Sequence, residues 1–196
     1  MPTVIEPRKT TQSSSSMNLH KTTIPENSVL YADRANYHYS DSYEVQIKDA
    51  TNRLTLIGAA NTFMKPSPKW INFLLKLRNL LVALVGLKTT EDVETNTNCQ
   101  FEPNERAGLF RVFSKTEHEL ILGEDDKHLN FRVSLYLETV PNDTCTKQIT
   151  VTTIVIYNNW FGRFYFFFVK PFHQLIVQTS LKCNFQTLEL DLQNQP

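Results

Sequence analysis

The residues best suited to chemistry form a charged run from Glu124 to His128, with the sequence EDDKH, and Asn130 and Arg132 follow it closely. Carboxylates beside an imidazole can carry out acid–base catalysis or hold a metal ion. The same composition is typical of a solvated turn between two strands, because Asp and Lys are common in such turns. We favour the turn for residues 124–127 and consider the polar side chains after it separately.

His128, Asn130 and Arg132 occupy alternate positions of a predicted strand, so they point to one side of a sheet and can converge on a single ligand. If that side faces a cavity, Arg132 can bind a carboxylate or enol oxygen through its planar guanidinium group. If it faces water, the three residues form an ordinary polar surface. We favour the second interpretation, since Leu129 and Phe131 belong to a better core face.

A second group of candidate residues lies in the aromatic stretch from Tyr157 to His173. So many rings must face a core or line an apolar cavity, because exposed ring area promotes aggregation. Core packing is the usual role of such rings, and a lone histidine among them is more often a hydrogen-bonded packing residue than a base. Together with the polar candidates, the candidate ligand-binding residues are His128, Asn130, Arg132, Trp160, Phe164, Phe168 and His173.

The sequence lacks the motifs that several classes of function require. The sequence has no Ser-His-Asp order, no glycine-rich phosphate loop and no His-x-x-x-His pair, so we expect no catalytic triad, no cofactor and no metal. Equal numbers of acidic and basic residues, 20 of each, argue against nucleic acid as an obligatory partner. Cys99, Cys145 and Cys183 form neither a Cys-x-x-Cys pair nor an even set, which favours a reducing cytoplasm.

Composition divides the chain into three parts. Residues 1–28 are rich in Ser, Thr and Pro, with few large apolar residues, and are predicted to form a flexible tail. Residues 29–183 are predicted to form a single domain, and residues 184–196 a loosely held C-terminal tail. The most apolar segment, 70–87, contains Lys76 and Arg78, so it is not predicted to span a membrane.

The periodicity of apolar residues predicts an α+β fold. Alternation with a period of two predicts an antiparallel sheet, and helical spacing predicts two short helices and a long C-terminal helix. Asp49 is expected to cap the first helix. The predicted strands are 42–47, 109–115, 119–123, 128–138 and 148–157, and the predicted helices are 50–64, 70–87 and 160–182.

The long helix 160–182 is predicted to bend at Pro171, because proline removes a backbone hydrogen bond and clashes with the preceding turn. Helical spacing gathers one largely apolar face, which is expected to cover a core or a cavity. Arg163, Lys170, Gln174 and Gln178 lie away from that face. The face consists of Phe164, Phe168, Phe172, Leu175, Ile176 and Thr179.

Three segments of the chain resemble a known family. They are FMKPSPKW at 63–70 with LRN at 77–79 and GLK at 86–88, then LILGEDDKHLNFRVS at 120–134, and finally NWFGRFY at 159–165 with KPFH at 170–173. Over residues 30–182 they resemble the bacterial domain of unknown function 2867, which is related in pattern to START and polyketide-cyclase-like (SRPBCC) proteins. The resemblance implies a helix-grip fold, in which a long C-terminal helix crosses a curved antiparallel sheet over a cavity. It supplies no activity, and only five strands are evident here where the helix-grip pattern has more.

Three functions follow from these observations. The first is binding of a small hydrophobic ligand in a cavity between the sheet and the C-terminal helix. The second is a cyclase- or isomerase-type enzyme in which Arg132 and His128 polarise a substrate and move protons. The third is an interaction module whose apolar helix 70–87 docks a protein partner or a membrane surface.

Overall fold

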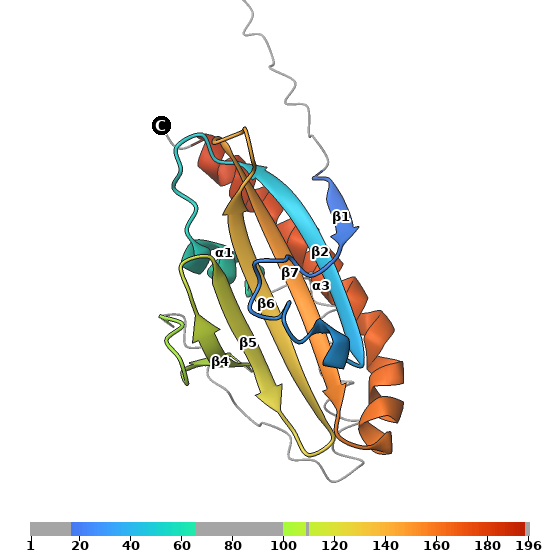
Figure 1. Cartoon of the computed structure of the whole chain (residues 1–196). Coiled ribbons are helices and arrows are strands. Elements are labelled where there is room, and N and C mark those ends of the chain that lie inside the picture. The colour runs from blue at the N-terminus through green and yellow to red at the C-terminus, as the bar shows by residue number, and fades with distance from the viewer. Residues whose placement is uncertain (1–16, 66–99, 109, 195–196) are drawn as a thin grey trace, which may run out of the picture.

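The computed structural model describes residues 17–65, 100–108 and 110–194 of the 196-residue chain. The helix expected at 70–87 lies outside the described residues, and so does the apolar surface on which the third hypothesis relied. Figure 1 shows the described elements, with the long C-terminal helix lying along one side of a single sheet.

Seven antiparallel strands form one open sheet in the order β1-β2-β7-β6-β5-β4-β3 (Figure 1). The predicted α+β class and antiparallel sheet are therefore confirmed, and two short strands, β1 and β3, add to the five that were expected. The strands are β1 (Leu19–Thr22), β2 (Tyr39–Lys48), β3 (Arg106–Ala107), β4 (Phe110–Lys115), β5 (Glu119–Asp125), β6 (Leu129–Thr139) and β7 (Thr146–Tyr157).

One face of the sheet carries the main hydrophobic core. On β6, Val133, Leu135 and Leu137 alternate with residues that point to the other face, as the period of two predicts. These side chains pack in one cluster with residues of α1 (Leu56–Phe63) and α3 (Trp160–Asn194). Both helices therefore lie on this side of the sheet.

An N-terminal segment covers part of the opposite face. Strand β1 pairs with β2, and after it Ile24 and Leu30 pack with Ile121 and Ile154 of the sheet. The single-turn 3₁₀ helix η1 (Arg34–Asn36) then leads into β2. Much of this structure falls within residues 1–28, which composition predicts to be a flexible tail. Strand pairing and the buried side chains of Ile24 and Leu30 stabilise the segment although its average hydrophobicity is low.

Helix α1 is shorter than expected and begins at Leu56 rather than at residue 50. Thr55 caps it, and its Oγ1 accepts a hydrogen bond from a first-turn backbone N–H at 3.1 Å. Asp49, the expected cap, instead accepts hydrogen bonds from the backbone N–H groups of Arg53 and Leu54, at 3.0 and 2.8 Å. The predicted cap was wrong because the Asp49 carboxylate stabilises the loop before the helix.

Helix α3 has 35 residues and continues through Pro171 to Asn194, well beyond the predicted end at residue 182. Asn159 caps its start, with Oδ1 accepting a hydrogen bond from a first-turn N–H at 3.0 Å. Near its end, Phe185 is completely buried, and the Glu189 carboxylate accepts a hydrogen bond from the backbone of β2 at 2.9 Å. These contacts attach Phe185 and Glu189 to the rest of the domain, although composition predicts a loosely held tail over residues 184–196.

Candidate functional site

Close packing against the sheet positions the start of α3. Gly162 approaches the His128 carbonyl so closely that an added Cβ would lie 2.0 Å from that oxygen. One turn later, Phe166 is buried against Leu129 and Val155. At this point the helix has little freedom to rotate about its axis, because protein interiors are densely packed.

A chain of hydrogen bonds holds the middle of α3 to β2. Gln174 Nε2 donates to the Tyr39 hydroxyl at 3.0 Å, and that hydroxyl donates to Asp41 Oδ2 at 2.6 Å. Burial, followed by the hydrogen bond to Asp41, raises the pKa of Tyr39 far above its usual value, so the hydroxyl stays protonated and can donate. One turn further on, Gln178 Nε2 donates to the Tyr43 hydroxyl at 3.2 Å.

His173, one of the predicted site residues, faces the sheet beside this network. Its Nε2 lies 3.6 Å from Asp41 Oδ1, and the Asp41 side chain is only 2% exposed. Neither atom has a hydrogen-bond partner in the described part of the chain, and the same is true of Oγ1 of Thr153, which lies opposite Asp41 on β7. The histidine is therefore placed to pair with a buried carboxylate beneath α3.

The opposite side of α3 presents aromatic side chains to solvent. Their exposed fractions range from 42% for Phe172 to 78% for Trp160. The rings contact one another, since Phe168 lies edge-on to Phe164 and Phe167 with ring centroids 5.1 and 5.3 Å apart. We call this set the outer aromatic face, and it consists of Trp160, Phe164, Phe167, Phe168, Phe172 and Leu175.

The expected orientation of the helix was therefore wrong. Phe164 and Phe168 were expected to cover the core but are half exposed, whereas Gln174 and Gln178 were expected to lie away from it but face β2. The physical reason is that two tyrosine hydroxyls on β2 provide partners for the glutamine amides. Other apolar residues supply the inner face, namely Phe166, Val177, Leu181 and Phe185.

Basic residues border the outer aromatic face. Arg163 and Lys170 are exposed within the same turns of α3, and Lys182 is exposed further along. No Asp or Glu occurs between residues 160 and 188, so this part of the helix is positively charged although the whole chain has a net charge of zero. Lys170 Nζ also lies 4.9 Å from the centroid of the Tyr39 ring.

Asn130 and Arg132 lie on the face of the sheet that points away from α3. Arg132 Nη2 forms an ion pair with Asp125 at 2.7 Å, and the guanidinium carbon lies 3.5 Å from the centroid of the Phe113 ring. Phe113 packs with the cluster beneath the N-terminal segment. Asn130 Oδ1 accepts a hydrogen bond from Asn158 at 2.9 Å. The structure thus separates these two polar candidates from the aromatic candidates on α3.

His128 connects the charged turn to the start of α3. Its ring packs against Phe161 with centroids 4.8 Å apart, and its Nδ1 lies 3.1 Å from Asn159 Nδ2. In the turn itself, Asp126 Oδ1 accepts a hydrogen bond from the His128 backbone N–H at 3.0 Å. His128 Nδ1 and Asp126 Oδ1 are therefore engaged in local hydrogen bonds.

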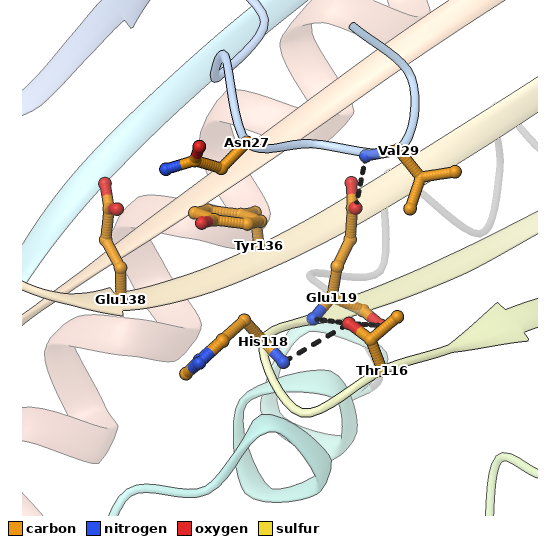
Figure 2. A pocket seen from close by; sticks show the side chains of 7 residues that line it. All are labelled: Asn27, Val29, Thr116, His118, Glu119, Tyr136 and Glu138. Atoms are coloured by element: carbon orange, nitrogen blue, oxygen red, sulfur yellow. Dashed lines mark hydrogen bonds between the residues drawn. The ribbon is translucent and has the colours of Figure 1, made fainter. Parts of the chain in front are cut away.

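A hollow of about 440 Å³ lies where the N-terminal segment crosses β5 and β6 (Figure 2). Glu119 is buried there and uses both carboxylate oxygens: Oε2 accepts from the Val29 backbone N–H at 2.7 Å, and Oε1 accepts from the hydroxyls of Ser28, at 2.5 Å, and Ser134. It therefore ties the segment to the sheet. A second hollow of about 290 Å³ shares part of this lining. The larger hollow is lined by Asn27, Val29, Thr116, His118, Glu119, Tyr136 and Glu138.

The inner network beneath α3 was not predicted from the sequence, although a signal was present. Tyr39, Asp41 and Tyr43 alternate along β2 as residues that share one face of a strand do. The predicted strand began at residue 42, so it left out the first two. Glu119 was not singled out either, although a carboxylate directly before three apolar strand residues requires buried donors.

Neither a metal site nor a membrane span occurs in residues 17–65, 100–108 and 110–194. No three His, Cys, Asp or Glu side chains in these ranges come together as a metal ion would require. No helix of the same ranges is both long enough and apolar enough to cross a bilayer.

Comparison with known proteins places the chain in a family. Residues 34–180 match the family described as protein of unknown function, DUF2867. The chain belongs to this family. The DUF2867 match begins at η1 and ends in α3 at Ser180, so it contains the inner network and the outer aromatic face but not β1. The resemblance to DUF2867 seen in the sequence is therefore confirmed. No curated protein and no solved structure matches the chain.

Proposed function

We propose that the protein is a non-catalytic docking module, which uses the outer aromatic face of α3 to bind a partner whose surface is apolar and negatively charged. One observation carries this proposal: six large apolar side chains are exposed along one side of a helix whose other side is attached to the sheet. Contiguous exposed apolar patches mark interaction sites on folded proteins.

The free energy available from covering this face is sufficient for binding. A phenylalanine buries on the order of 200 Å² when fully enclosed, so covering the exposed half of one ring is worth about 2.5 kcal/mol at ~25 cal/mol per Å². A basic residue close to an anionic surface adds about 1 kcal/mol. The rings therefore supply most of the attraction, and Arg163 and Lys170 select the charge of the partner.

The attachment of α3 to the sheet also favours binding. Gln174 and Gln178 are hydrogen bonded to β2, and Gly162 is packed against a backbone carbonyl. The outer aromatic face is consequently formed before any partner arrives. Binding then does not require the helix to be ordered, which is a large part of the cost of association for flexible segments.

The enzyme alternative receives less support from the same geometry. It required Arg132 and His128 to act on one substrate, but Arg132 is paired with Asp125 on the face away from α3, while His128 packs against Phe161. Each side chain has a local partner that accounts for its position.

A small hydrophobic ligand between the sheet and α3 was expected to contact Trp160, Phe164 and Phe168. All three rings are exposed on the outer side of α3, so we propose that they contact a docked partner instead. Binding of a small ligand beneath the helix stays a prediction, and His173 and Asp41 are polar groups that lie there.

We also propose that the protein has a helix-grip fold and a cytoplasmic location. The order β2, α1, β3 to β7 and α3, with α3 across one face of the sheet, supports the helix-grip interpretation of a single domain. Cys145 and Cys183 are free and exposed, as suits a reducing compartment.

Binding of a hydrophobic fluorescent dye to the full chain tests the docking function. We expect the variant Phe164→Ser/Phe167→Ser/Phe168→Ser to bind the dye several-fold more weakly than the wild type, with an unchanged circular dichroism spectrum. Leu190→Ser is the matched control, because Leu190 is an apolar residue of the same helix with 48% exposure, and it should leave dye binding intact. Equal dye binding by the triple variant and the wild type would contradict the proposal.

A further inference from the structure

We infer that the partner of the outer aromatic face is the surface of an anionic lipid bilayer. This inference rests on the docking function proposed above and names the partner for that same surface.

The side chains of the face are those that favour the interface between water and hydrocarbon. Five of the six are aromatic, and they recur every three or four residues from Trp160 to Leu175, so they form one stripe along roughly 22 Å of helix. Helices that lie in a membrane surface combine Trp and Phe on one side with Lys and Arg beside them. Trp160, the most exposed ring, has an indole that prefers the depth of the lipid headgroups.

Charge complementarity selects an anionic surface. Arg163, Lys170 and Lys182 are exposed on α3, and no acidic residue opposes them before Glu189. With the rings at the level of the headgroups, the basic side chains beside them can reach lipid phosphates and carboxylates. Lys and Arg have long aliphatic stems that allow such contacts while the charge remains hydrated.

The same charges disfavour a second copy of the chain as the partner. If two copies paired helix to helix through this face in antiparallel fashion, Arg163 and Lys170 of each would border the contact, and neither helix would bring an acidic side chain to it. Like charges placed together across an interface weaken association.

The shape of the face suits a flat partner. The face is the side of α3 turned away from the sheet along which the helix lies (Figure 1), and the convex surface of a helix forms a ridge. The hollows of about 440 and 290 Å³ described above are lined by the N-terminal segment and lie on the opposite face of the sheet. A ridge meets a deformable bilayer along its whole length, whereas a protein partner would need a matching groove.

Sedimentation of the full chain with lipid vesicles tests the inference. One set of vesicles contains phosphatidylcholine alone, and the other contains phosphatidylcholine with a minority of phosphatidylserine. We expect binding to the second set to be roughly tenfold stronger and to weaken as salt is added. In a Trp70→Phe background, which leaves Trp160 as the single tryptophan, vesicle binding should shift its fluorescence to shorter wavelength.

Two variants separate the contributions of charge and rings. Arg163→Glu/Lys170→Glu should lose the preference for phosphatidylserine, while Lys21→Glu/Lys48→Glu, which makes the same charge change at exposed positions on β1 and β2, should keep it. Phe167→Ser/Phe168→Ser should weaken binding to both kinds of vesicle.

The outcomes distinguish this inference from the function on which it rests. If vesicles do not bind, or bind equally with and without phosphatidylserine, while dye binding still depends on Phe164, Phe167 and Phe168, the bilayer is the wrong partner and the docking face stands. If dye binding does not depend on these residues, both proposals fall. Self-association that Phe167→Ser/Phe168→Ser abolishes would identify a second copy as the partner and overturn the inference.

Discussion

The side-chain amide of Gln174 on α3 donates a 3.0 Å hydrogen bond to the hydroxyl of Tyr39 on β2, a residue 135 positions away in the sequence. A second bond of the same kind joins Gln178 to Tyr43, also 135 positions apart. Together they turn the side of α3 that carries Gln174 and Gln178 toward the sheet. The outer aromatic face is therefore a consequence of contacts made on the other side of the helix.

Removal of the Tyr39 hydroxyl should weaken the attachment of α3. In Tyr39→Phe, Asp41 Oδ2 and the Gln174 amide both lose their partner, and we expect the free energy of unfolding to fall by about 1–3 kcal/mol. Urea denaturation followed by circular dichroism measures the change. Tyr31→Phe, which also removes one hydroxyl but lies in the N-terminal segment, should cost less, and equal stability of Tyr39→Phe and the wild type would show that the network is unimportant.

The close approach of Gly162 to the His128 carbonyl predicts that no side chain is tolerated there. In Gly162→Ala the added methyl would meet the carbonyl oxygen at 2.0 Å, so α3 must move, and we expect a loss of about 1–3 kcal/mol in unfolding free energy. Gly58→Ala in α1 is the matched control, since its nearest contact would be 3.3 Å from a side-chain oxygen. Thermal unfolding compares the two variants, and a smaller loss in Gly162→Ala than in Gly58→Ala would contradict the packing described for α3.

Glu119 should control the attachment of the N-terminal segment. Glu119→Gln replaces one acceptor oxygen by a donor, so it cannot accept all the hydrogen bonds from Ser28, Val29 and Ser134. We expect faster proteolytic cleavage within residues 23–38, detected by mass spectrometry, with the rest of the domain intact. Glu117→Gln, at an exposed neighbouring position, should be cleaved like the wild type. Unchanged cleavage of Glu119→Gln would show that the segment is held by its apolar contacts alone.

The chain should lose stability at alkaline pH. Burial is the main cause that raises the pKa of five of its seven tyrosines, which are Tyr37, Tyr39, Tyr43, Tyr136 and Tyr157. In the unfolded chain a tyrosine ionises near pH 10, so above about pH 10 the unfolded state binds fewer protons than the native state and the free energy of unfolding falls. Below that pH the contribution is fully present.

Ultraviolet absorbance of tyrosinate and circular dichroism, followed together as pH rises, measure this effect. We expect most tyrosines to ionise only as the fold is lost. Ionisation of all seven tyrosines near pH 10 with the fold retained would contradict the predicted loss of stability.

The sequence by itself determined the class of the fold and most of its sheet. In β6 the alternation of Leu129, Phe131 and Val133 with polar residues assigns a strand and its buried face from local information alone, because one face of the sheet is covered and the period is two. Helix α3 was also predictable as a helix, because Phe164, Phe168, Phe172 and Leu175 recur every three or four positions.

Only the tertiary structure decided how that helix is rotated and how residues 17–30 and 184–194 pack on the sheet. Between residues 160 and 176 apolar side chains occur all around the helix, so periodicity cannot choose the buried side. The choice depends on Tyr39 and Tyr43, whose hydroxyls become partners only when β2 and α3 meet in space. The N-terminal segment is likewise held by Glu119, about 90 residues later in the chain, a contact that no local pattern encodes because its donors and its acceptor are distant in sequence.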